Sequence, residues 1–309
     1  IHRYLKWNKE ANDFQINELN KNFQRLVIVD ETSMIDTHLF DALLKGICTN
    51  IQLILVGDAN QLPSVGPGLI LSDLINSAVF TFTPLETIYR QSNNSYIPYL
   101  AQEIKNKNLS NDYLTKKDDY NFLNATGSNI RELIKMICER SIKKGLTDKD
   151  IQILAPMYKG ENGIDNLNIT LQEFFNPDDN QKAEAIIGPI TYREGDKVLN
   201  LVNDVDNNIY NGDIGYIDSI NLNSKKDFII VNYEGNYVSY KKEDINTITH
   251  AYAISIHKSQ GSEFGYVIMP ISLSYSRMLY NKLLYTGVSR AKKSLILIGS
   301  LDAFNQSIY

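Results

Sequence analysis

The chain has 309 residues, of which 43% are hydrophobic and 22% are charged, and its formal net charge at pH 7 is −5. This length and apolar content are enough for two domains with hydrophobic cores and exclude a disordered chain. The acidic balance argues against a protein that simply coats nucleic acid. A motor that must release its track in every cycle needs only a local basic groove.

The first third of the chain alternates short β-branched runs with helical patterns. We expect strands over 26–30 and 51–57 and helices near 36–46, 69–76 and 95–107. These elements would form most of an α/β domain over residues 1–110. The acidic, Asn-rich stretch from Asn106 to Asn124 predicts a linker or a polar loop.

The remainder repeats the same alternation around a segment of different texture. We expect helices near 128–144, 163–175 and 276–289 and strands over 151–155, 264–271 and 294–299. Between them, residues 193–248 give short alternating strands broken by Asn, Gly and Asp, which predicts a small inserted β-barrel. The second domain would therefore cover 111–192 and 249–309, with the barrel between its two parts.

Cys48 and Cys138 lie far apart in apolar or helical surroundings, with no Cys-x-x-Cys pair. This usage favours buried free thiols over a disulfide or a metal site and predicts a cytoplasmic location. No apolar run approaches the roughly 20 residues of a membrane span, so we expect no membrane partner.

Acidic and amide side chains follow both strands of the first domain. Asp30 and Glu31 come directly after LVIV, and Asp58 and Gln61 follow IQLILV. The carboxyl ends of parallel strands meet at one edge, so these four side chains should share a crevice. Paired acids there can hold a metal on nucleotide phosphates and activate a water, although a polar turn after a core strand is the simpler alternative.

Five segments fall in the order and approximate spacing of superfamily 1 helicase motifs. LVIVDETSM (26–34) resembles motif II, and GDANQLPSVGPG (57–68), YRQ (89–91), HKSQGSEF (257–264) and YTGVSRA (285–291) resemble motifs III, IV, V and VI. Motifs III and V and the stretch 155–177 resemble the RecD/TraA branch, which includes the exodeoxyribonuclease V alpha subunit. The resemblance implies two RecA-like domains, the first incomplete, with an SH3-like barrel inserted in the second.

The resemblance also implies an ATP-dependent helicase on single-stranded DNA that uses ATP and Mg²⁺ in recombination and repair, with 5′ to 3′ travel. In such an enzyme Asp30 would bind Mg²⁺, Glu31 would activate water and Gln61 would sense the γ-phosphate. Arg90 and Arg290 would be arginine fingers, one from each domain. An arginine in an ordinary salt bridge is the alternative for each.

Motif V would join the nucleotide to the DNA. Gly261 permits close backbone approach, and Gln260 and Glu263 would face the nucleotide, as would Asp58 of motif III. His257 and Lys258 would face the strand backbone. The other candidate DNA contacts are Arg3, Pro63 and Lys159.

The expected barrel is rich in tyrosine. Its aromatic side chains could stack on bases of a single strand, since stacking tolerates any sequence. Filling the barrel core is the more ordinary role for such residues. The five candidates are Tyr210, Tyr216, Tyr233, Tyr237 and Tyr240.

A phosphate-binding loop reads G-x-x-x-x-G-K-[ST], and the chain contains no Gly-Lys pair. The opening residues 1–5 resemble the segment that follows this loop, so we expect a C-terminal fragment that is inactive alone. A strand would be missing between those ending at Asp30 and Gly57. Either the two strands close up or another chain fills the gap, because unpaired backbone groups are costly.

Two other classes of protein stay open. The first is a catalytically inactive DNA-binding or scaffold subunit of a helicase–nuclease complex, whose other subunits are possible partners in either case. The second is a small-molecule kinase. The polar set Asp30, Glu31, Gln61, Arg90 and Arg290 argues against the first, and two linked α/β halves argue against the second.

Overall fold

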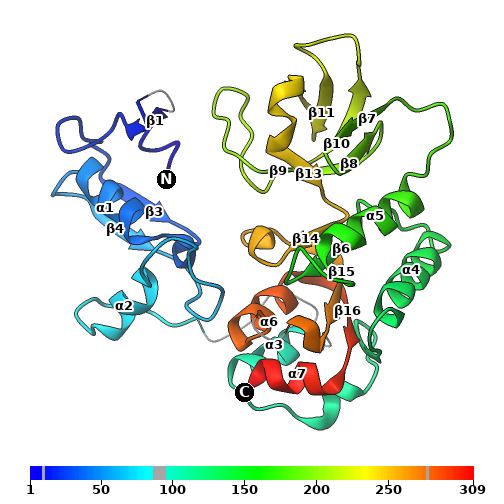
Figure 1. The fold of residues 1–309 in the computed structure, drawn as a ribbon. Coiled ribbons are helices and arrows are strands. Elements are labelled where there is room, and N and C mark those ends of the chain that lie inside the picture. The colour runs from blue at the N-terminus through cyan, green and yellow to red at the C-terminus, as the bar shows by residue number, and fades with distance from the viewer. Residues whose placement is uncertain (9–10, 86–94, 276–277) are drawn as a thin grey trace. The chain divides into compact units, whose positions relative to one another are not determined.

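The computed structural model describes residues 1–309 except 9–10, 86–94 and 276–277. The chain divides into two compact units, Ile1–Tyr89 and Arg90–Tyr309, each with its own core (Figure 1). Within the described residues, no helix has the length and apolar character needed to cross a membrane.

The first unit is built on two parallel strands, β3 (Leu26–Val29) and β4 (Gln52–Leu55). Helix α1 (Thr37–Gly46) connects them and packs its apolar face on their core, and α2 (Ile70–Asn76) follows. Near the N-terminus, β1 (Trp7–Asn8) and β2 (Asp13–Phe14) form a small hairpin. The strand and helix positions predicted for this region are confirmed to within a few residues.

β3 and β4 are direct neighbours, with Val29 opposite Leu55. Beyond the strands, Val56 N donates to Val29 O (2.8 Å) and Thr32 N donates to Val56 O (2.9 Å). The expected gap between these strands is therefore closed by direct pairing, one of the two arrangements expected from the sequence. The strand ends that carry the acidic residues lie side by side as a result.

The second unit contains a five-stranded parallel sheet in the order β14-β6-β15-β16-β5. The strands are Ala253–Ser255, Ile151–Ala155, Phe264–Ile271, Ala291–Gly299 and Tyr120–Asn124 in that order. Helices α4 (Asn129–Ile142) and α5 (Ile164–Phe175) cover one face. Helices α3 (Ile97–Lys105), α6 (Asn281–Val288) and α7 (Leu301–Ile308) cover the other (Figure 1). All five β6 residues are buried, as covering both faces requires.

Three expectations for this unit were wrong. The stretch 106–124 is not a linker, because it contains a 3₁₀ turn (Asn111–Leu114) and the edge strand β5. Tyr120 and Phe122 of that strand are buried, and the polar residues around them hid the alternation. Helix α3, grouped above with the first domain, lies in the second unit, where Asn281 Nδ2 donates to Ile104 O (2.6 Å). Helix α6 begins at Asn281, later than predicted.

The barrel segment forms an antiparallel sheet in the order β12-β11-β10-β9-β13. Its strands are Asn236–Tyr240, Ile229–Tyr233, Ile214–Ile220, Lys197–Asn200 and Ile248–His250, and a hairpin of β7 (Glu184–Ile187) and β8 (Ile190–Arg193) packs beside it. Tyr233 and Tyr240 are buried and share a hydroxyl hydrogen bond of 2.7 Å. The core-filling role is therefore confirmed for these two, whereas Tyr237 is exposed.

A buried carboxylate joins the barrel to the parallel sheet. Asp196 has no exposed surface and accepts hydrogen bonds from Arg193 N, Gln172 Nε2 and Asn176 Nδ2 (each 2.7 Å) and from His250 Nε2 and Tyr252 OH (each 3.0 Å). Burial alone would raise the pKa of Asp196, but His250 and the other donors hold it below the usual value. The carboxylate is therefore charged at neutral pH and satisfies donors from several elements at once.

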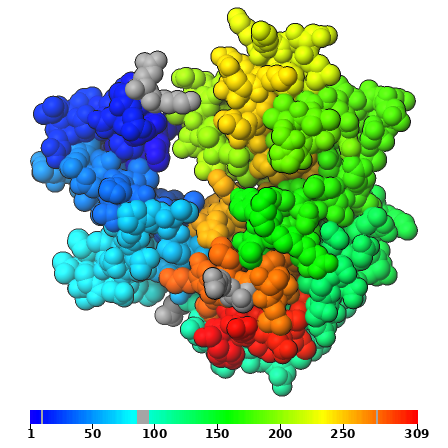
Figure 2. All heavy atoms as spheres, viewed as in Figure 1, coloured from blue at the N-terminus to red at the C-terminus, as the bar shows by residue number. Residues whose placement is uncertain are grey.

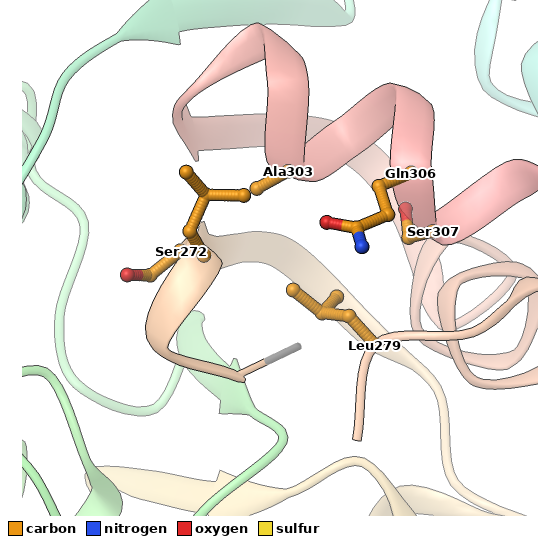
Figure 3. Close-up of a pocket in the computed structure, with 6 residues that line it drawn as sticks. Ser272, Leu279, Ala303, Gln306 and Ser307 are labelled. Atoms are coloured by element: carbon orange, nitrogen blue, oxygen red, sulfur yellow. The ribbon is translucent and has the colours of Figure 1, made fainter. Parts of the chain in front are cut away.

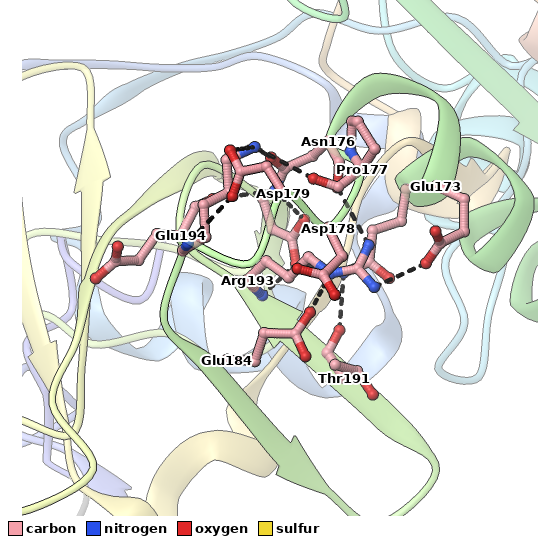
Figure 4. Close-up of polar contacts among 12 residues, drawn as sticks. Glu173, Asn176, Pro177, Asp178, Asp179, Glu184, Thr191, Arg193 and Glu194 are labelled. Atoms are coloured by element: carbon pink, nitrogen blue, oxygen red, sulfur yellow. Dashed lines mark hydrogen bonds and ion pairs between the residues drawn. The ribbon is translucent and has the colours of Figure 1, made fainter.

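Two basic side chains strengthen the same junction. The buried Lys197 amine donates to Asp148 O (2.7 Å) and Ile151 O (3.2 Å), and burial lowers its pKa to about 8. The Arg193 guanidinium contacts Glu173 (2.8 Å) and Glu184, so it ties β8 to helix α5 (Figure 4). The space-filling view shows barrel and sheet body meeting over a continuous surface (Figure 2).

We expect Asp196→Ala to lower the free energy of unfolding by about 3 kcal/mol, because it leaves several buried donors without an acceptor. Urea unfolding followed by circular dichroism measures the change. Asp218→Ala, at an exposed position on β10, is the matched control and should change stability by less than about 0.5 kcal/mol. An equal effect of the two substitutions would show that the junction contributes nothing specific.

Candidate functional site

The end of β3 holds its two acids in different ways. Asp30 is exposed, and its Oδ1 accepts a hydrogen bond from Glu31 N (2.8 Å). Glu31 adopts a left-handed backbone conformation, with φ 51° and ψ 42°. For a residue with a side chain this conformation costs of the order of 1–2 kcal/mol, and such strain is concentrated at functional sites. Thr32, buried beneath, anchors the turn through Oγ1 to Val29 O (3.0 Å).

The motif III loop starts at the end of the neighbouring strand. Asp58 Oδ1 accepts bonds from Asn60 N (2.9 Å) and Asn60 Nδ2 (3.0 Å), which fixes a tight turn. Gln61, 7% exposed, follows this turn, and its N donates to Asp58 O (3.2 Å). Its Oε1 is buried and, among the described residues, accepts no hydrogen bond. A buried carboxamide oxygen of this kind is available to a water or a ligand donor.

The motif III loop is fastened to the start of helix α1, just after motif II. Asp36 caps that helix by accepting from Leu39 N (2.8 Å), and Thr37 N donates to Pro67 O (2.8 Å). A Cβ at Gly66 would lie 2.1 Å from Asp36 Oδ2. A Cβ at Gly68, whose φ is +103°, would lie 2.1 Å from Thr37 Oγ1. These glycines allow the close approach of the loop to the helix. Pro63 is half-buried in the same loop.

Motif V follows β14 as a single 3₁₀ turn, η4 (His257–Ser259). Buried Ser259 donates through Oγ to Ile256 O (2.8 Å), and Lys258 N donates to Ser255 Oγ (3.2 Å). Gly261 is exposed at φ +76°, where glycine is favoured. Burial lowers the pKa of His257, so its imidazole is neutral at pH 7.

Motif VI is bonded to motif V through Arg290, which is 1% exposed. Its Nη1 donates to Ser262 O (3.2 Å) and its Nε to Thr286 O (3.2 Å), while Phe264 N donates to Arg290 O (2.9 Å). The guanidinium therefore faces the motif V turn. Glu263, expected to face the nucleotide, forms an ion pair with Lys292 (2.6 Å), and Gln260 is half-buried on the same turn.

The remaining candidates are less constrained. Arg3 is exposed, and Lys159 is 88% exposed and pairs with Asp165 (2.7 Å). Arg90 lies outside the described residues. The structure thus gathers Asp30, Glu31, Asp58 and Gln61 at one edge of the first unit. It gathers His257, Lys258, Gln260, Gly261, Glu263 and Arg290 on one turn and its neighbour in the second.

The sequence did not predict the contact of Arg290 with Ser262 or that of Glu263 with Lys292. No local sequence pattern indicates these contacts, because they depend on tertiary packing. A shallow hollow lies between α7 and the turn after β15, lined by Ser272, Leu273, Leu279, Ala303, Gln306 and Ser307 (Figure 3). It contains none of the candidate residues.

Comparison with protein families identifies three matches along the chain. Residues 1–127 match the AAA domain family, and residues 250–298 match the UvrD-like helicase C-terminal domain. Residues 167–233 match the SH3 domain of ATP-dependent RecD-like DNA helicases. The last match covers most of the barrel strands.

Curated relatives match along nearly the whole chain. The ATP-dependent RecD2 DNA helicase of Deinococcus radiodurans is 30% identical over 304 residues, which is 98% of this chain and 40% of that protein. The RecBCD enzyme subunit RecD of Mycolicibacterium smegmatis is 25% identical, over 97% of this chain and 54% of that protein. The chain spans about half the length of these relatives.

Solved structures agree on the fold. The Pif1 helicase from Candida albicans superposes with a TM-score of 0.55 at 17% identity, over 93% of this chain and 75% of that chain. A structure of two coordinating Pif1 helicases at forked double-stranded DNA superposes with a TM-score of 0.54 at 17% identity, over 89% of this chain and 69% of that chain. With RecA-like parallel sheets, an SH3-like barrel and RecD relatives along its length, the chain is similar throughout to the RecD-like helicases of superfamily 1.

Proposed function

We propose that this protein is an ATP-dependent DNA helicase that hydrolyses ATP while it moves along single-stranded DNA, in DNA recombination and repair. The observation that carries the proposal is the pairing of β3 with β4, which sets Asp30 and Glu31 beside the motif III loop of Gln61. A carboxylate pair next to a buried, available carboxamide suits the hydrolysis of a phosphoanhydride.

In the first unit, each side chain has a distinct role. Asp30 would hold Mg²⁺, since its carboxylate is exposed at the strand end and carboxylate oxygens suit this ion. Mg²⁺, when bound with ATP, supplies charge neutralisation on the phosphates. Glu31 would orient a water and accept its proton, and Gln61 would hold that water through its Oε1. Asp58 would lie beside the nucleotide and would stabilise the turn that presents Gln61.

In the second unit, Arg290 would stabilise charge on the terminal phosphate, with Arg90 as the arginine from motif IV. Gln260, Gly261 and Glu263 would line the nucleotide on the motif V side. Because Glu263 now pairs with Lys292, contact with a nucleotide would require exchange of that ion pair.

The candidate DNA contacts combine cations with a shaped loop. Lys258, Lys159 and Arg3 supply positive charge for phosphates, while neutral His257 supplies a ring donor and Pro63 a rigid surface. Travel from 5′ to 3′ is part of the proposal and rests on the RecD resemblance. Other helicase–nuclease subunits are proposed as partners, because several relatives are named as subunits of RecBCD.

The proposal is tested by measuring ATP hydrolysis with and without single-stranded DNA, on the full-length protein and on residues 1–309. Residues 1–309 contain no Gly-Lys pair, so we expect no turnover from them alone. We expect DNA-stimulated turnover from the full-length protein. No turnover in either would favour the alternative, a catalytically inactive DNA-binding subunit of a helicase–nuclease complex.

A further inference from the structure

A side-chain contact joins motif V to the barrel. Lys258 Nζ donates to Asn211 Oδ1 at 2.6 Å. Asn211 belongs to the loop of residues 201–213 between β9 and β10, which we call the barrel loop. The backbone also comes close here, since a Cβ at Gly212 would lie 3.8 Å from Lys258 O.

The barrel loop is held rigidly behind Asn211. Fully buried Asn200 donates through Nδ2 to Tyr210 O (2.9 Å), and Gly212 N donates to Asn200 O (2.9 Å). Asn211 N donates to Asn203 Oδ1 (3.0 Å). The Asn211 carboxamide is therefore presented from an anchored loop, even though its side chain lies at the surface.

The partner of Lys258 is a neutral amide, although acids lie nearby in the same loop. Asp204 accepts from Asn207 Nδ2 (2.7 Å) and Asp213 accepts from Tyr210 N (2.7 Å), so both carboxylates are engaged within the loop. Among the described residues, no carboxylate oxygen lies within 4.0 Å of Lys258 Nζ. The ammonium is oriented by this contact without being neutralised.

An oriented but uncompensated ammonium suits a phosphate. Lysine has three N–H donors, and the contact with Asn211 uses one of them. Fixing a long side chain in advance removes part of the entropy cost of binding. Lys258 is half-buried, and this burial lowers the pKa of its amine.

We propose that Asn211 is a positioning residue that holds Lys258 for a phosphate of bound single-stranded DNA, so that motif V and the barrel grip the strand as one unit. This inference rests on the proposed function. It adds a barrel residue that acts through motif V, a role separate from base stacking by the barrel tyrosines.

The test measures binding of a fluorescent oligothymidylate to the full-length protein by anisotropy, over a series of salt concentrations. Lys258→Ala should weaken binding and reduce the slope of log K against log salt by about 0.7, the value of one phosphate contact on a single strand. Asn211→Ala should weaken binding about threefold to tenfold. Placed in the Lys258→Ala background, it should add no further loss.

Asn211→Asp separates positioning from a structural role. Aspartate keeps the acceptor oxygen and the loop geometry but neutralises the ammonium, so it should weaken binding at least as much as alanine and lower the salt slope. Asn223→Ala, at an exposed position between β10 and β11, is the control and should bind like the wild type.

Wild-type binding by Asn211→Ala or by Asn211→Asp would overturn the inference, as would a full additional loss in the Lys258→Ala background. If the wild-type protein does not bind the oligonucleotide at all, the proposed function fails together with the inference. If only the inference fails, the wild-type protein still binds the oligonucleotide, so the two failures are distinguishable.

Discussion

Glu31→Gln is expected to lower DNA-stimulated ATP turnover of the full-length protein about 10²-fold to 10⁴-fold while single-strand binding stays near the wild-type value. Glutamine has nearly the same volume and can occupy the left-handed conformation at this position, so the turn after β3 should persist. It cannot accept the proton of an attacking water. The loss should therefore appear in kcat and leave the KM for ATP nearly unchanged.

Steady-state hydrolysis at saturating single-stranded DNA measures the effect. Glu18→Gln is the matched control, because it removes an exposed carboxylate from the same unit outside the candidate site. Its turnover should equal that of the wild type. If Glu31→Gln retained more than about a tenth of wild-type turnover, Glu31 would lose its assigned role and a different base would have to be sought.

The sequence was sufficient where the signal was local. The β-branched runs at 26–30, 151–155 and 264–271 became parallel strands, and the turn residues of the barrel marked its strands. Strand β5 was missed because Asn and Asp surround its two buried aromatics. β14 was missed because three residues are too few for a period.

The proximity of the candidate residues within each unit was predictable from the sequence, but their contacts were not. Motif order alone brought Asp30 and Glu31 to the same edge as Gln61. The ion pair of Glu263 with Lys292, the contact of Lys258 with Asn211 and the burial of Arg290 depend on side chains far apart in the chain. Such contacts are selected by tertiary packing and leave no periodic trace. The hydrogen bonds of Asp196 were unpredictable for the same reason, since its partners are as far apart in the chain as Gln172 and Tyr252.

The burial of Arg290 gives its substitution two consequences. The guanidinium satisfies the carbonyls of Ser262 and Thr286, so Arg290→Ala should lower the free energy of unfolding by about 1–3 kcal/mol. It should also relax the link between motifs V and VI. A loss of activity therefore has to be separated from a loss of folded protein, and urea unfolding followed by circular dichroism measures the latter.

Arg290→Ala in the full-length protein should lower DNA-stimulated ATP turnover by about 10³-fold or more, because a fixed cation on the terminal phosphate is worth that much in related phosphoryl transfers. Arg290→Lys keeps the charge but not the fork of donors, so it should also be strongly impaired. Lys293→Ala, an exposed cation close by in the chain, should turn over like the wild type. If Arg290→Ala remained folded and hydrolysed ATP within tenfold of the wild type, the buried guanidinium would be a structural link between motifs V and VI and nothing more.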